Sequence, residues 1–248
     1  MATRSAPSDR RPLELADHLE CTTLSSLLRG KLCEQLKARP ARRVPAGRVL
    51  YVRGDAARSV FLVRSGLVKT SMVSEGGEEL TLRVCPRGEI IGELCWCSGE
   101  RREQAVALEA SEVVEIPLTD LIAQLKRSPE AMADFIVAAC DQLADAYDKL
   151  ESRSFESTAA RLVRTLIRLA RDLGEQTANG ISIPHYIKQE ELAHLIGARR
   201  EVVSTWLNRL RARRLLSYTR KGRITMDVSG LAAYLQTLSR ARTQSERG

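Results

Sequence analysis

The sequence predicts an α+β chain of three parts: an N-terminal β-roll, a long helix and a C-terminal winged helix-turn-helix. Three observations lead to this fold class. Short apolar runs separated by glycine turns follow one another between residues 43 and 116. An apolar heptad stripe runs through residues 129–154. Two short helical segments joined at Gly197 precede a pair of β-like runs with a basic turn between them.

The first part of the chain is polar. Residues 1–22 lack the apolar core and small-residue cleavage site of a secretory signal, so we expect a polar N-terminal extension. A short helix is expected over residues 24–36. No apolar run reaches the roughly 18–20 residues that span a bilayer, which favours a cytoplasmic protein with no membrane partner. In that compartment most of the cysteines should be reduced.

The β-roll is expected within a domain that spans residues 23–128. Its apolar runs are short and recur about every 8–12 residues, with turns at positions such as Gly54, Gly66 and Gly88. The predicted strands are 49–52, 60–63, 67–73, 80–84, 105–108 and 113–116.

The long helix is expected over residues 129–155. Its apolar residues alternate at spacings of 4 and 3, a pattern that favours pairing with a second copy over an ordinary core helix. The residues of this dimer seam are Met132, Ile136, Ala139, Leu143, Ala146 and Leu150. Phe135, Cys140 and Tyr147 lie off the stripe, where they could face the β-roll.

The net charge of +8 lies entirely in the last quarter of the chain. Residues 185–248 hold 13 Lys and Arg against 5 Asp and Glu, whereas residues 1–184 hold 26 of each. A basic segment attached to a neutral body is typical of nucleic-acid binding. A solubilising tail is the alternative, but this segment also carries regularly spaced Leu, Ile and Val.

The C-terminal part, residues 156–248, begins with an expected helix over 157–172. Helices over 188–196 and 199–213 then form the helix-turn-helix, in which Gly197 permits a positive φ. The second helix should enter the major groove, where Arg bonds guanine and Glu bonds cytosine. The outward residues near its start are the base-reading candidates: Arg200, Glu201, Ser204 and Thr205.

A β-hairpin over 216–218 and 224–228, with the basic turn 219–223, should form the wing. Cations at the wing tip and beside the two helices are suited to phosphate contacts. The phosphate candidates are Lys188, Arg199, Arg220, Lys221 and Arg223, with Arg211, Arg213 and Arg214 behind them.

With these motifs the chain, from about residue 43 to 228, resembles the Crp/Fnr superfamily of the cyclic-AMP receptor protein and the fumarate–nitrate regulator. The run 88–94 looks like the start of that family's phosphate-binding cassette. The resemblance implies a homodimeric bacterial transcription regulator that binds inverted-repeat double-stranded DNA, modulated by a signal sensed in a cyclic-nucleotide-binding-like roll. If the regulator activates transcription, the resemblance implies RNA polymerase as a further partner.

The resemblance assigns roles to single residues of the helix-turn-helix. Arg200 and Glu201 match the family's base-reading pair, and Ser204 matches a serine used in the fumarate–nitrate branch. Thr205 stands where another base-reading Arg is usual, so the preferred half-site should depart from the family's consensus.

The resemblance also implies an effector pocket in the roll, formed by Gly92, Glu93, Leu94, Arg101, Arg102 and Tyr147. Gly92 and Glu93 match the pair that holds the ribose in cyclic-AMP binders, and Arg101 can be placed at the phosphate-binding Arg. However, Arg102 replaces a Ser or Thr, Glu103 replaces a small residue, and 146–147 replace a Thr-Ser pair. These departures argue against cyclic AMP and leave the effector's identity open.

Other function classes have less support. Cys95 and Cys97 in the cassette, with Cys21 and Cys33 before the roll, could suggest an iron–sulfur cluster, but their wide spacing argues against one, and no metal site is assigned. The sequence has no Walker A loop, Rossmann glycine pattern or hydrolase motif, so we do not expect the protein to be an enzyme. The alternative is a cyclic-nucleotide-binding module that regulates a partner protein, although such a module would not need a basic winged helix.

Overall fold

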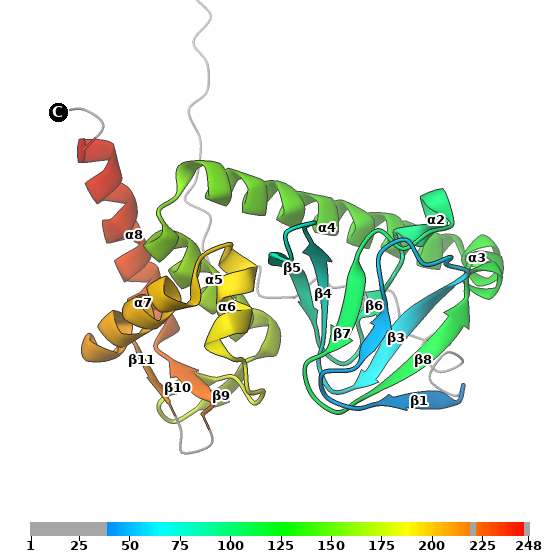
Figure 1. The fold of residues 1–248 in the computed structure, drawn as a ribbon, viewed down its shortest axis with the longest axis horizontal. Coiled ribbons are helices and arrows are strands. Elements are labelled where there is room, and N and C mark those ends of the chain that lie inside the picture. Colours follow the sequence, from blue (N-terminus) through cyan, green and yellow to red (C-terminus); the bar gives the residue numbers. More distant parts are fainter. Residues whose placement is uncertain (1–38, 219–221, 246–248) are drawn as a thin grey trace, which may run out of the picture.

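One long helix joins a β-roll to a C-terminal domain in the computed structural model, which describes residues 39–218 and 222–245 (Figure 1). That helix, α4 (Pro129–Phe155), confirms the predicted range. The expected helix over 24–36, the cysteines Cys21 and Cys33, and the wing residues Arg220 and Lys221 lie outside the described residues.

The roll consists of two four-stranded antiparallel sheets. The first has the order β1 (Ala41–Val44), β8 (Ser111–Pro117), β3 (Ser59–Ser65) and β6 (Ile90–Ile91). The second has the order β2 (Val49–Tyr51), β7 (Gln104–Ala107), β4 (Val68–Val73) and β5 (Glu79–Cys85). The six predicted strands are present. β1 and β6 were not predicted because β1 has two arginines in four residues and β6 has only two residues.

The first sheet is covered on both faces. Phe61 and Val63 of β3 point into the roll, while Val60 and Leu62 pack against α3 (Leu118–Arg127) and α4 on the other side. A strand buried on both faces has a continuous apolar run instead of an alternating one, as β3 does.

The start of α4 lies against the roll. Ser128 caps the helix through its side chain, which accepts a hydrogen bond from the Ala131 N–H. Phe135 packs on Trp96 of the short helix α2 (Cys95–Ser98), with 5.2 Å between ring centroids. The prediction that Phe135 faces the roll is therefore confirmed.

The corresponding prediction for Cys140 and Tyr147 is wrong, whereas the seam assignment of Met132 stays a prediction. Cys140 and Tyr147 do not face the roll, because both side chains are exposed. Met132, assigned to the dimer seam, is half-buried against the roll core, because its position one turn before Phe135 turns it toward the first sheet.

The C-terminal domain surrounds a single apolar core. It contains the helices α5 (Thr158–Leu173), α6 (Gln189–Ile196), α7 (Arg200–Ala212) and α8 (Val228–Ser245). Its sheet has the order β11 (Leu216–Tyr218), β12 (Ile224–Met226), β10 (Gly180–Ser182) and β9 (Glu175–Thr177). The predicted hairpin is thus confirmed and belongs to a larger sheet. β9 and β10 escaped prediction because their pairing needs only backbone groups and β9 is wholly polar.

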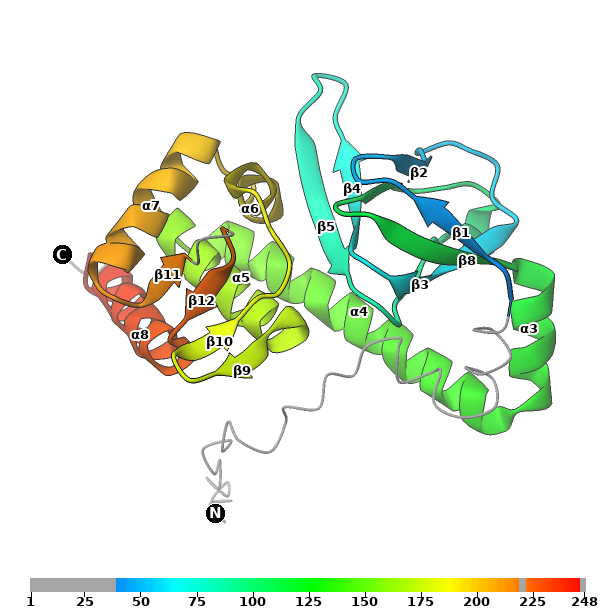
Figure 2. The same ribbon diagram turned by 90° about the horizontal axis from the view of Figure 1, so that it is seen from below.

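The two domains also contact each other directly. β5 of the roll lies beside α6, as Figure 2 shows from below. Leu67 of the roll is buried in the apolar core of the C-terminal domain, and Val84 and Leu108 of the roll pack against the same core. The first helix of the helix-turn-helix is therefore seated against the roll. No helix among the described residues is long and apolar enough to cross a membrane.

Candidate DNA interface and effector pocket

The helix-turn-helix forms where the sequence places it. α6 ends at Gly197, whose φ of +61° puts it in the left-handed region and whose N–H caps the helix at the Ala193 carbonyl. A Cβ at Gly197 would lie 2.6 Å from a guanidinium nitrogen of Arg153, which reaches this turn from the end of α4. The left-handed backbone conformation favours glycine here, whereas the Arg153 guanidinium is the end of a flexible side chain that could move away from a methyl group.

α7 has one buried face and one free face. Val203, Leu207 and Leu210 are buried in the domain core. Arg200 and Glu201 in the first turn are exposed, and neither side chain has an ion pair among the described residues. Their hydrogen-bonding groups are therefore available to a ligand.

The other two base-reading candidates are more restricted. The Thr205 hydroxyl donates a 2.9 Å hydrogen bond to the Glu201 carbonyl one turn earlier. Ser204 is half-buried at the edge of the core face. All four predicted residues lie on the first two turns of α7. Sequence reasoning missed Val202, an exposed apolar residue in the first turn, although its position off the inward stripe was a usable signal.

The cations around α7 fall into two groups. Lys188, Arg199 and Arg223 are exposed at the start of α6, the start of α7 and the wing. Two others are drawn back onto aromatic rings: Arg209 lies 4.6 Å from the Trp206 ring centre, and Arg213 lies 5.0 Å from that of Tyr234. Arg213, expected at the phosphates, therefore also connects α7 to α8.

A buried ion-pair network joins the roll to α6, and we call it the Lys69 network. The Lys69 ammonium of β4 lies 2.9 Å from Oε1 of Glu79 and 2.7 Å from Oε2 of Glu191 on α6. Nδ1 of His194 lies 3.3 Å from Oε2 of Glu79. The Lys69 side chain is only 5% exposed, so this contact between the domains is shielded from solvent. Burial alone raises the pKa of Glu79, but hydrogen bonds from Ser71 and Lys69 and the attraction of the nearby cations outweigh it, so the pKa is lowered.

The predicted effector residues do not all converge in the roll. Leu94 and Arg102 are exposed, and Tyr147 is 63% exposed on α4. Gly92, Glu93 and Arg101 do come together inside the roll. The Arg101 guanidinium donates to the Gly92 carbonyl at 3.1 Å and stacks 4.2 Å from the centre of the Tyr51 ring.

Acidic groups surround this arginine. Tyr51 donates a 2.9 Å hydrogen bond to Glu103, and burial raises the pKa of the tyrosine, with further contributions from Glu103. Glu93 accepts a 3.3 Å hydrogen bond from Arg83, and burial raises its pKa because desolvation outweighs the attraction of that arginine. Within the part of the chain that the structure describes, one carboxylate oxygen of Glu93 and one of Glu103 are buried without a hydrogen-bond partner. The interior is therefore compact and rich in carboxylates.

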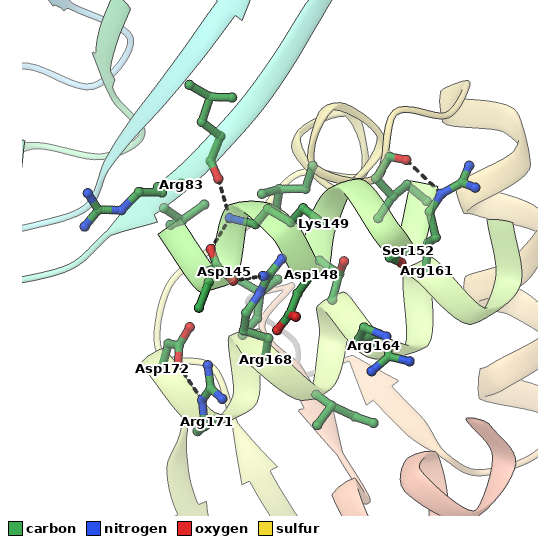
Figure 3. A pocket seen from close by; sticks show the side chains of 18 of the residues that line it. Arg83, Asp145, Asp148, Lys149, Ser152, Arg161, Arg164, Arg168, Arg171 and Asp172 are labelled. Atoms are coloured by element: carbon green, nitrogen blue, oxygen red, sulfur yellow. Dashed lines mark hydrogen bonds and ion pairs between the residues drawn. The ribbon is translucent and has the colours of Figure 1, made fainter. Parts of the chain in front are cut away.

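A separate cleft of about 690 Å³ lies between β5, α4, α5 and α6 (Figure 3). Lys149 of α4 donates to the Leu82 carbonyl of β5 at 2.8 Å and pairs with Asp145, which also pairs with Arg168 of α5. Nε of Arg161 on α5 donates to the Ile196 carbonyl at the end of α6 at 3.2 Å. The walls of the cleft are thus connected to one another by polar contacts.

The cysteines whose side chains the structure describes do not form a cluster, and the side chain of Cys97 lies outside that described part. Cys85 and Cys95 are buried at separate positions, and burial raises the pKa of the Cys85 thiol to about 12. Cys140 is exposed on α4. Within the described ranges, no three His, Cys, Asp or Glu side chains are grouped as metal ligands.

Comparison with known proteins matches both domains. Residues 41–128 match the family model described as a cyclic nucleotide-binding domain, and residues 160–234 match the Crp-like helix-turn-helix domain. The chain is 32% identical over 170 residues to the cyclic AMP receptor protein of Thermus thermophilus, covering 68% of this chain and 76% of that protein. It is 28% identical over 177 residues to the global nitrogen regulator of Nostoc sp., with coverages of 70% and 79%.

A solved structure agrees with this relationship. The c-di-GMP-responsive global regulator of Xanthomonas campestris is 26% identical and superposes with a TM-score of 0.65 over 78% of this chain and 97% of that one. The helix-turn-helix match supports DNA binding over the alternative of a module that acts only on a protein partner. With the roll, the long helix and the helix-turn-helix all in place, the chain belongs to the Crp/Fnr superfamily of bacterial transcription regulators.

Proposed function

We propose that the protein binds inverted-repeat DNA as a homodimer, with one α7 in the major groove of each half-site. The observation that carries this proposal is the first turn of α7, where Arg200 and Glu201 are exposed and form no ion pair with residues 39–218 or 222–245, while the opposite helix face is buried. Such a turn can place a guanidinium against guanine and a carboxylate against cytosine.

The dimer is formed through α4. Ile136, Leu143 and Leu150 are 56%, 53% and 62% exposed in the single chain, and Ala139 and Ala146 lie exposed between them. An exposed apolar stripe of this length is typical of a helix that packs against another copy. A two-fold dimer requires two half-sites related by symmetry, about one helical turn apart.

The proposed division of labour separates affinity from specificity. Arg200 and Glu201 read bases, with Ser204 and Thr205 beside them. The cations Lys188, Arg199, Arg220, Lys221 and Arg223 contact phosphates. The chain has four parts: a polar N-terminal extension (residues 1–22), the roll domain (23–128), the dimerisation helix (129–155) and the DNA-binding domain (156–248). The protein acts in the cytoplasm, where bacterial DNA lies, and an activating role would add RNA polymerase as a partner.

Two adjacent arginines test this docking. Sites are first selected from a random DNA library, and affinities are then measured by fluorescence anisotropy at several salt concentrations. Arg200→Ala should weaken the selected site and relax the choice at one base pair per half-site, at a cost of about 1–3 kcal/mol. Arg199→Ala should weaken all sequences similarly and lower the salt slope by about one ion per subunit. Selected sites without an inverted repeat, or interchanged effects of the two variants, would contradict the docking.

We also propose that DNA binding does not require cyclic AMP. The candidate phosphate ligand, Arg101, is 5% exposed, and its guanidinium is already engaged by the Gly92 carbonyl and the Tyr51 ring. These residues do not fit a cyclic phosphate in this conformation. Calorimetric titration with cyclic AMP and gel shifts with and without it test the proposal. Micromolar binding coupled to a large gain in DNA affinity would overturn it.

A further inference from the structure

The exposed face of α7 contains a small apolar surface beside its charged first turn. Val202 is 38% exposed although the neighbouring Val203 is fully buried. Thr205 follows three residues later, and residues at this spacing are neighbours on a helix surface. An apolar side chain in the turn that should lie deepest in the groove needs an apolar partner there to be favourable.

The Thr205 side chain adds a methyl group to this surface. Its hydroxyl is already a donor to the Glu201 carbonyl at 2.9 Å, so the proton that could read a base acceptor is in use within the helix. The branched Cβ still carries Cγ2. Arg209, one turn further along, lies over the Trp206 ring, 4.6 Å from its centre, which draws its charge toward the indole.

In the major groove, the apolar feature of a base edge is the 5-methyl group of thymine. Placing Val202 against the polar edge of another base would remove hydrogen-bonding groups from water without replacing their bonds. We propose that Val202 and Thr205 together read a thymine methyl in each half-site. This inference rests on the docking of α7 described above, and it identifies residues that select thymine where the chain departs from the family's usual arginine.

The test uses the selected DNA site with each thymine replaced in turn by uracil, which removes only the 5-methyl group. Affinity is measured by anisotropy for the full-length protein. We expect one position per half-site at which uracil weakens binding about fourfold, the equivalent of one buried methyl group, and about fifteenfold when both half-sites are changed. Val202→Ala should bring this thymine-to-uracil ratio close to one. Thr205→Ser, which removes the methyl but keeps the hydroxyl, should reduce it.

Matched controls separate this effect from loss of folding. Val73→Ala changes a similarly exposed valine, 41% exposed on β4 of the roll, and should leave the ratio unchanged. Thermal denaturation of each variant checks its stability. If no thymine is sensitive to uracil, or if sensitivity persists in both Val202→Ala and Thr205→Ser, the methyl-reading role is wrong while the docking stands. If no site is selected at all, the docking itself fails.

Discussion

Lys69 provides a direct test of how the roll holds the helix-turn-helix. Its ammonium contacts Glu79 of its own sheet and Glu191 of α6 from a nearly buried position. Lys69→Met keeps most of the side chain's length and apolar surface but removes the charge. The two carboxylates, with side chains 18% and 16% exposed, would then face each other without their shared cation.

The expected cost follows from this geometry. Removing one partner of a buried ion pair costs about 3–5 kcal/mol, because the remaining charge is left desolvated. The two carboxylates keep some contact with water, at 18% and 16% side-chain exposure, so we expect the lower end, about 3 kcal/mol. For a chain of this size, that corresponds to a fall in Tm of about 6–12 °C.

Denaturation of Lys69→Met, Glu191→Gln and the double variant measures the coupling between the domains. The cost of the double variant should be smaller than the sum of the single costs by at least about 1 kcal/mol, because each single change removes the same contact. Lys126→Met, at an exposed lysine of α3, is the control and should stay within about 0.5 kcal/mol of the wild type. Strict additivity, or a Lys69→Met variant as stable as the control, would refute the reasoning.

Three further predictions concern the dimer, the turn and pH. Leu143→Glu should give monomers in analytical ultracentrifugation by placing like charges in the seam, whereas Val73→Glu, at a similarly exposed position, should remain dimeric. Gly197→Ala should cost about 1 kcal/mol in urea denaturation, because its φ of +61° is strained for alanine. Gly99→Ala, at a φ of +71°, should cost a similar amount, because the new methyl at Gly197 would meet only the flexible end of Arg153; a much larger loss at Gly197 would contradict this. The pKa values of Glu79 and Asp145 are lowered despite burial, Glu79 by hydrogen bonds and nearby cations and Asp145 by attraction to Lys149 and Arg168. The folded state then binds fewer protons than the unfolded state, so stability present above pH 4.5 should be lost as pH falls through the lowered values. Glu79→Gln should flatten the Tm curve between pH 6 and pH 3, and an unchanged curve would contradict the assignment.

The spacing of apolar residues predicted the helices that have one continuous apolar face. The 4/3 spacing located α4, and the inward stripe of α7 located Val203, Leu207 and Leu210, because an apolar helix face repeats with the helical period whether it is exposed in the single chain, as in α4, or buried, as in α7. β6 and β9 show no such periodic spacing of apolar residues. They are held by backbone pairing to neighbouring strands, which any residue type can provide.

The contacts of single side chains were less predictable. The assignment of Arg101 as a phosphate ligand rested on its place in the sequence. Its contacts with Tyr51 and Gly92 depend on how the strands of the roll pack together in three dimensions, which the sequence does not display. Lys69 follows the inward-facing Val68 on β4, so the strand pattern alone places it on the outer face of the sheet. Its side chain is buried because the C-terminal domain covers that face, which the strand pattern does not indicate. Tyr147 illustrates the same limit, since a shift of one or two residues around a helix decides between facing the roll and facing solvent.

The arrangement of contacts around α6 has a consequence for regulation. Two elements hold this short helix through polar contacts: β4 through Lys69 and α5 through Arg161. The adjoining α7 keeps its outward face free. A rearrangement of the roll that moves β4 must therefore carry α6 with it or break a buried ion pair, and either outcome changes the placement of α7. Because packed interfaces switch between discrete arrangements instead of deforming gradually, we expect a rearrangement of the roll to reach α7 through α6.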